Sequence, residues 1–315
     1  MKALVYAGDR SVAWIDVAEP KPQPGDEIVD VLVAGVCGTD LGAVRSGRPP
    51  IPAGMVLGHE FVGRRRRDGA LVTGNPILSC GECRSCKEGR PHLCERREVL
   101  GVHRPGAFAP SLAIPAASLR AVGQLDLARA AMVEPIATAL HAWRLSPMPS
   151  GNVAVLGAGP IGMSLLHVLK AFAVQDIIVT DLAPERLAIA RACGADQVSD
   201  KVTGVYDVVL DTVGAAETRR DAVERVRAGG TAILVGLHSP DLSVAGGVVV
   251  AGERTIRGSF AYTPREFDEA IDLAATLDTR WVAKVPFHLS AGTFTHMLNG
   301  TADPASVKVH FHIAD

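Results

Sequence analysis

Short alternating runs of apolar and polar residues dominate the first third of the chain. Residues 1–17 alternate like a pair of strands, and residues 27–36 (EIVDVLVAGV) alternate and are rich in β-branched side chains. The runs 60–65 and 70–75 flank an Asp-Gly dipeptide, which is typical of a hairpin turn. This region is therefore predicted to form a β domain.

The pattern changes near residue 126, where helix-like and strand-like segments begin to alternate. Helix signals occur in residues 126–133, 136–143, 183–195, 217–230 and 265–277, and directly after the strand-like run 153–156. Further strands are predicted within residues 177–181, 205–214, 231–237 and 255–260, with terminal strands within 284–290 and 306–313. Regular alternation of strands and helices predicts a parallel sheet.

A glycine motif lies at the first of these strand-to-helix turns. Gly157, Gly159 and Gly162 form G-x-G-x-x-G between an apolar strand and an apolar helix, and Asp181 ends the next strand. This arrangement is the fingerprint of a dinucleotide site, in which the helix N-terminus faces the pyrophosphate and the carboxylate binds the ribose hydroxyls. A glycine turn without a ligand is the alternative. Asp181 favours NAD over NADP, although Arg186 could offer partial relief to a phosphate.

Four cysteines form a dense polar loop, SCGECRSCKEGRPHLC, in which the spacing is C-x₂-C-x₂-C-x₇-C. They are Cys80, Cys83, Cys86 and Cys94. Disulfides would require an oxidising compartment, and the last gap does not fit the bacterial iron–sulfur pattern. Four thiolates fit a closed, structural zinc site, and four unliganded cysteines are the remaining alternative.

Composition and charge exclude several function classes. The 315 residues are 48% hydrophobic and 21% charged, which is enough for one large or two medium domains. A net charge of −2 gives no basic field for nucleic acid or anionic lipid, and the run Arg64 to Arg67 is predicted to be a solvated strand end. No apolar run is long enough to span a membrane, and the first residues do not resemble a signal peptide. A reducing, cytoplasmic location is expected.

Several short motifs together resemble the zinc-dependent medium-chain alcohol dehydrogenases over nearly the whole chain. The matching pieces are CGTD at 37–40, GHE at 58–60, the four-cysteine loop, EPIATALHA at 134–142 and GAGPIG at 157–162. The Glu-Pro pair at 134–135 is similar to the sorbitol, polyol and threonine dehydrogenase branches. The resemblance implies a GroES-like β domain with an inserted Rossmann domain.

The resemblance also implies a catalytic zinc, which would be the second zinc of each subunit. Its ligands would be Cys37, His59 and Glu134, with Glu60 as a neighbouring acid that can approach or leave the metal. Asp40 would orient the His59 imidazole.

Further roles come from the same resemblance. Thr39 would take the proton from the alcohol, while hydride passes to the nicotinamide. Thr138 would lie near the nicotinamide ring. The expected coenzyme residues are Gly157, Gly159, Pro160, Ile161, Gly162, Asp181, Arg186 and Thr138.

The sequence departs from the family pattern at two places, which are expected to affect the substrate and the rate more than the fold. Gly42 stands where relatives often have a histidine that ends the proton relay, and the segment 63–79 is short. We expect residues 1–136, completed by 263–315, to form the catalytic domain and residues 137–262 the NAD-binding domain.

The expected function is a zinc-dependent oxidoreductase. It would transfer hydride between NAD and a small secondary alcohol, polyol or amino alcohol, or the matching ketone or aldehyde. Assembly as a homodimer or homotetramer is expected. The alternative is a non-catalytic NAD- and zinc-binding protein, which would lack a catalytic ligand, whereas Cys37, His59 and Glu134 are all present.

Overall fold

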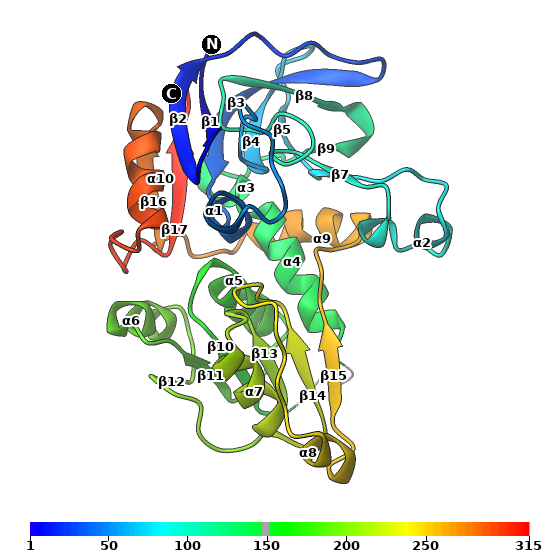
Figure 1. Cartoon of the computed structure of the whole chain (residues 1–315), viewed down its shortest axis with the longest axis vertical. Helices are drawn as coiled ribbons and strands as arrows, with labels where there is room; N and C mark the ends of the chain where they lie inside the picture. Colours follow the sequence, from blue (N-terminus) through cyan, green and yellow to red (C-terminus); the bar gives the residue numbers. More distant parts are fainter. Residues whose placement is uncertain (147–150, 315) are drawn as a thin grey trace. The chain divides into compact units, whose positions relative to one another are not determined.

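The chain forms two compact units in a computed structural model that describes residues 1–146 and 151–314. The first unit comprises Met1–Glu134 and Thr263–Asp315, and the second comprises Pro135–Tyr262 (Figure 1). Helix α4 (Val133–Arg144) carries the chain from the first unit into the second. Within the described ranges, no helix is both long and apolar enough to span a membrane.

The first unit is built on a seven-stranded sheet. Its strands run in the order β16-β17-β3-β4-β5-β9, with β8 paired to β3, and only β16 and β17 pair in parallel. The strands of this sheet are β3 (Asp26–Gly35), β4 (Glu60–Arg65), β5 (Leu71–Gly74), β8 (Ser111–Pro115), β9 (Leu119–Ala121), β16 (Val282–Pro286) and β17 (Lys308–His312). This mainly antiparallel sheet agrees with the β domain that the sequence predicts.

Smaller elements complete this unit. Two-stranded sheets are formed by β1 (Lys2–Gly8) with β2 (Ser11–Asp16), and by β6 (Ile77–Leu78) with β7 (Glu98–Val99). The helices are α1 (Gly38–Ser46), α2 (Arg84–Lys87), α3 (Leu127–Ala130), α9 (Pro264–Ala274) and α10 (Ser290–Leu298), with 3₁₀ turns at Pro91–Leu93, Ala116–Ser118 and Phe287–Leu289.

Aromatic side chains fill the core of the first unit. Phe108 and Phe311 meet edge to face, with ring centroids 5.1 Å apart, and both are fully buried. Phe61 of β4 and Leu4 of β1 belong to the same apolar cluster. The C-terminal strand β17 therefore belongs to the core that the N-terminal residues begin.

The second unit is a six-stranded parallel sheet in the order β12-β11-β10-β13-β14-β15. Its strands are β10 (Val153–Leu156), β11 (Ile177–Thr180), β12 (Gln197–Ser199), β13 (Tyr206–Asp211), β14 (Val226–Leu234) and β15 (Thr255–Gly258). Its helices are α5 (Pro160–Ala171), α6 (Pro184–Ala192), α7 (Ala216–Glu224) and α8 (Gly246–Ala251), and Figure 1 shows them beside the strands. This is the doubly wound arrangement of a Rossmann domain.

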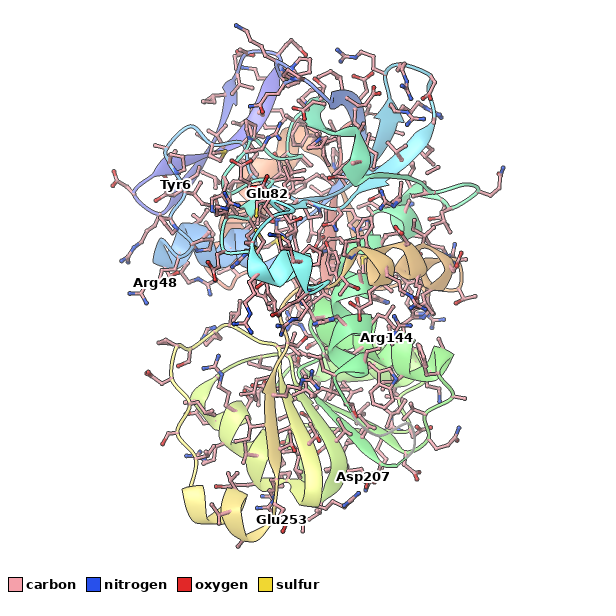
Figure 2. The ribbon with its side chains drawn as sticks, turned by 90° about the vertical axis from the view of Figure 1, so that its right-hand side faces the viewer. Tyr6, Arg48, Glu82, Arg144, Asp207 and Glu253 are labelled. Atoms are coloured by element: carbon pink, nitrogen blue, oxygen red, sulfur yellow. The ribbon has the colours of Figure 1, made fainter. Side chains whose placement is uncertain are left out.

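The strand order of the second unit determines where a ligand can bind. The chain runs outward from β10 to β11 and β12, and then returns to place β13 on the other side of β10. Open parallel sheets bind ligands at the carboxyl ends of the strands where the order reverses in this way. That point lies between the ends of β10 and β13. Asp207, labelled in Figure 2, lies near the start of β13, at the edge of the sheet opposite to these carboxyl ends.

One predicted helix differs from the structure. The helix expected within residues 217–230 ends at Glu224, and β14 begins at Val226, since the β-branched Val226 pairs with Tyr206 of β13. The sequence also did not predict α1, which begins directly after Cys37. Its low apolar content gives it little helical periodicity.

Candidate metal and coenzyme sites

The cysteine loop folds into a compact cluster of four sulfur atoms. Cys83 precedes α2, and the backbone N–H of Cys83 donates to the Cys80 sulfur at 3.4 Å. The Sγ–Sγ distances are 3.4 Å from Cys80 to Cys94, 3.5 Å from Cys83 to Cys86 and 4.0 Å from Cys80 to Cys86. A tetrahedron of sulfurs about 2.3 Å from zinc has edges of about 3.8 Å. The four cysteines therefore fit zinc.

The electrostatics of this loop also suit a metal-bound thiolate. The backbone N–H groups of Glu82 and Cys83 lower the pKa of the Cys80 thiol to about 6. Arg96 donates from Nη2 to the same sulfur at 3.3 Å. Glu82, labelled in Figure 2, lies 3.4 Å from Arg96. These contacts favour the thiolate form of Cys80, which is the form that binds a metal.

A second group of ligand atoms lies between β3 and β4. The Cys37 sulfur, a ring nitrogen of His59 and a carboxylate oxygen of Glu60 all lie within 4.8 Å of one another. Cys37 is the N-cap of α1, and its sulfur accepts from the backbone N–H of Thr39 at 3.5 Å. His59 and Glu60 are buried. A soft thiolate, an imidazole and a carboxylate form a donor set that suits zinc.

Asp40 connects the two strand ends that carry this group. Its Oδ2 accepts from the backbone N–H of Cys37 at 3.0 Å, and its Oδ1 accepts from that of Gly58 at 3.3 Å. The same Oδ1 lies 3.3 Å from Nδ1 of His59. Burial opposes a charge on His59, but Asp40 and the Cys37 sulfur raise its pKa well above the usual value. Metal binding here must therefore release a proton.

Lys308 is a residue of this site that sequence reasoning missed. Its ammonium group pairs with Oε2 of Glu60 and donates to the carbonyl of Val36 at 2.9 Å. The pair packs over Gly35, where an added Cβ would lie 2.2 Å from Glu60 Oε2. In the sequence, Lys308 alternates with apolar residues, a pattern that normally marks a solvent-facing side chain. Its burial depends on the pairing of β17 with β3, which the local pattern does not encode.

Three other predicted residues do not belong to this group of ligand atoms. Glu134 is buried on α4. Its carboxylate is not one of the ligand atoms that lie within 4.8 Å of one another, and the carboxylate of that group belongs to Glu60. Thr39 is half-buried in the first turn of α1, next to the Cys37 sulfur. Thr138 is half-buried on α4.

The glycine turn joins β10 to α5 as the sequence predicts. Gly159 is the N-cap of α5, followed by Pro160 and Ile161 in its first turn. An added Cβ on Gly162 would lie 1.8 Å from the carbonyl oxygen of Gly157, so the two chain segments touch. The backbone N–H groups at this helix start have no helical acceptors and can face phosphate oxygens.

Asp181 is fixed directly after β11. Its Oδ2 accepts from the backbone N–H of Ala158 at 2.8 Å, and its Oδ1 accepts from that of Ala183 at 2.9 Å. The carboxylate is thus attached to the glycine turn. Arg186 approaches Oδ2 to 3.8 Å and is 35% exposed, so it could border a ligand at this position.

Thr212 is a second residue that sequence reasoning did not single out. Its hydroxyl, at the end of β13, donates to the carbonyl of Leu156 at 2.8 Å and contacts that of Gly157 at 3.2 Å. It therefore ties the end of β13 to the start of the glycine turn. The Asp-Thr-Val-Gly run that contains it could have indicated a turn, but not which carbonyl it binds.

The arginine run 64–67 is paired within the first unit. Arg65 lies 2.5 Å from Asp68, and Arg67 lies 3.2 Å from Glu27. Arg66 pairs with Asp30, and Arg64 donates to the carbonyl of Gly69 at 3.2 Å. The local positive charge of this run is therefore largely matched by neighbouring carboxylates.

Comparison with known proteins identifies both units. Residues 23–124 match the family model of the alcohol dehydrogenase GroES-like domain, and residues 160–276 match that of the zinc-binding dehydrogenases. An L-threonine 3-dehydrogenase of Streptomyces avermitilis is 36% identical over 82% of this chain and 84% of its own length. The chain belongs to the zinc-dependent medium-chain alcohol dehydrogenase family.

Solved structures of relatives agree with this family. The Escherichia coli alcohol dehydrogenase rspB, solved with NADH, superposes with a TM-score of 0.91 at 26% identity, over 99% of both chains. A Sinorhizobium meliloti protein solved with NADP gives a TM-score of 0.90 at 28% identity, over 99% of this chain and 98% of its own.

The comparisons confirm the predicted family, the predicted fold and the predicted enzyme class. The family of zinc-dependent dehydrogenases also confirms zinc and a nicotinamide dinucleotide as the cofactors. They do not support the alternative of a non-catalytic binding protein.

Proposed function

We propose that this zinc-dependent dehydrogenase oxidises a small secondary alcohol, such as a polyol or a hydroxy amino acid, with NAD. The observation that carries the proposal is the close approach of Cys37, His59 and Glu60 in a chain that also contains a dinucleotide turn. The first unit acts as the metal-carrying catalytic domain, and the second acts as the coenzyme domain.

Zinc would be held by Cys37 and His59 together with a carboxylate. When bound, it supplies a Lewis acid that polarises the alcohol oxygen, and NAD accepts the hydride. Glu134 is the family's position for the third ligand, whereas Glu60 provides the carboxylate that lies beside the other two residues. Oδ1 of Asp40 lies 3.3 Å from Nδ1 of His59, so Nε2 is the nitrogen proposed to face the metal.

Thr39 is proposed to accept the proton of the substrate hydroxyl. It lies in the first turn of α1, two residues after Cys37. Asp40 accepts a hydrogen bond from the backbone of Cys37 and so fixes the start of the helix that carries Thr39. A hydroxyl can receive one proton only by passing on its own, so the relay requires a further acceptor. Gly42 supplies none, and water or a nearby base must complete the relay.

Coenzyme binding is assigned to the second unit. The turn from Gly157 to Gly162 and the start of α5 would hold the pyrophosphate, and Asp181 would bind the adenosine ribose. Thr138 and Arg186 are proposed as further contacts.

The similarity to L-threonine 3-dehydrogenase makes hydroxy amino acids the first substrates to test. The experiment is a panel of hydroxy amino acids, sugar alcohols and diols, each assayed for NADH formation. Oxidation of at least one secondary alcohol is expected. No NADH formation from any of them, with a fully zinc-loaded protein, would contradict the proposed substrate class.

We also propose a homodimer or homotetramer in the cytoplasm. Strand β15 ends the six-stranded sheet, and its residues are mostly exposed, so this edge could pair with a second copy. The described cysteines form no disulfides, which is compatible with a reducing compartment. Sedimentation velocity of the purified protein would test the assembly.

A further inference from the structure

Arg219 of α7 is a buried arginine, and both of its Nη atoms donate hydrogen bonds within the second unit. It is 8% exposed, although α7 carries exposed residues on both sides of it. Its Nη1 donates to the carbonyl of Asp241 at 2.6 Å, and its Nη2 donates to that of Gly236 at 3.1 Å. Burying a guanidinium is costly unless it is bound in this way. The two contacts fix both ends of the loop 236–241.

The same loop is attached to the end of β13 by its backbone. The carbonyl of Asp211 accepts from Val235 at 2.9 Å and from Gly236 at 3.0 Å, and Ser239 donates to the carbonyl of Gly214 at 2.8 Å. Gly214 and Gly236 lie back to back, since an added Cβ on Gly214 would lie 2.2 Å from Gly236. These contacts hold the loop against the end of β13, although Leu237 at its tip is 76% exposed.

The place of this loop in the sheet relates it to the coenzyme. The adenosine half is assigned to Asp181 after β11, and the pyrophosphate to the turn after β10. A dinucleotide bound across the switch point must then continue over the ends of β13 and β14, on the other side of β10. The loop 236–241 begins two residues after β14 ends. It is thus next to the expected path of the nicotinamide half.

We propose that Arg219 is a positioning residue for the nicotinamide half of the coenzyme, acting through the loop 236–241. This inference rests on the proposed function. Arg219 holds the loop that lines the nicotinamide side without touching the coenzyme itself. The adenosine side is assigned to Asp181 and the glycine turn. Among the described residues, the hydrogen bonds of Arg219 go to the loop and not to these groups.

The proposal separates the two halves of the coenzyme, so two probes test it. ADP reports on the adenosine half, and NADH reports on both halves. Calorimetry of the zinc-loaded wild-type protein, Arg219→Met and Arg219→Lys measures both affinities. Arg220→Met is the matched control, because Arg220 is the adjacent arginine on the exposed face of α7.

Arg219→Met should weaken NADH binding about tenfold, as expected for the loss of charge-assisted hydrogen bonds, and change ADP binding less than about twofold. Arg219→Lys should lie between Arg219→Met and the wild type, and it keeps the test open if Arg219→Met does not fold. The KM for NAD should rise more than kcat falls.

Equal weakening of ADP and NADH would assign Arg219 a purely structural role and overturn the proposal. Unchanged binding of both ligands would also overturn it. Failure of the wild-type protein to bind either ligand would instead refute the proposed coenzyme site, and with it this inference.

Discussion

Lys308 of β17 and Glu60 of β4 form an ion pair beside Cys37 and His59, and both side chains are enclosed by protein, with exposures of 0% and 1%. Lys308→Met should therefore destabilise the first unit by about 3–5 kcal/mol, because it leaves a buried carboxylate without its partner. Denaturant unfolding followed by tryptophan fluorescence would measure the loss.

Two further variants define this prediction. Lys284→Met is the control, since Lys284 is exposed on the neighbouring strand β16 and its loss should change stability little. Adding Glu60→Gln to Lys308→Met should recover part of the stability, because it removes the unpaired charge. Equal stability of the Lys308 and Lys284 variants would show that the buried pair contributes nothing.

His310 gives the protein a defined sensitivity to acid. It is fully buried, neither ring nitrogen has a hydrogen-bond partner among the described residues, and burial together with Lys308, His312 and Lys284 lowers its pKa well below the usual 6.5. Below pH 6.5 the unfolded chain binds a proton at this histidine that the folded chain does not bind. Stability should therefore fall as the pH falls.

The comparison of wild type with His310→Leu isolates this contribution. Between pH 7.5 and 5.5 the wild-type protein should lose about 1 kcal/mol more stability than the variant, and urea unfolding at both pH values measures the difference. Parallel losses in the two proteins would mean that His310 keeps its ordinary pKa in the folded state.

The choice of coenzyme depends on Asp181. A carboxylate facing a 2′-phosphate should cost about 1–4 kcal/mol, so NAD should be preferred over NADP by about tenfold to several hundredfold. Asp181→Ser should narrow this preference, as measured by the ratio of kcat/KM for the two coenzymes. A wild-type preference for NADP would show that Arg186, which lies 3.8 Å from Asp181, determines the pocket.

Gly42 makes the end of the proton relay testable. It lies in α1, and a Cβ added there would meet no atom within 4 Å, so the position has space for the start of a side chain. The wild-type rate should rise with pH and respond to small buffer bases, because water must complete the relay. Gly42→His should raise kcat modestly near neutrality and reduce the response to imidazole. A wild-type rate that is independent of both pH and buffer would show that proton transfer does not limit it.

The local sequence was sufficient for the parts of the fold that are defined over short distances. The turn from Gly157 to Gly162 and the cluster of Cys80, Cys83, Cys86 and Cys94 each lie within one segment, and the structure brings their atoms together. Such motifs carry their geometry in their spacing.

Contacts between distant segments could not be predicted in this way. Lys308 and Val36 are 272 residues apart in the sequence, and the pairing of β17 with β3 brings Lys308 to Val36 and Glu60. The pattern of β17 alone would place Lys308 in solvent. Arg219 likewise looks like one of several charged residues on α7. Its function depends on a loop that follows β14, and strand order determines where that loop lies.

Metal analysis of purified protein is the most direct test of the central claim, that the chain holds two zinc ions in two separate sites. The wild-type protein should contain two zinc ions per chain. Cys37→Ser should keep one of them and lose alcohol oxidation. Cys80→Ser should lose the other and fold poorly, because closed zinc sites contribute to folding. One zinc per wild-type chain, visible iron absorbance, or two zinc ions retained in Cys37→Ser would contradict the account.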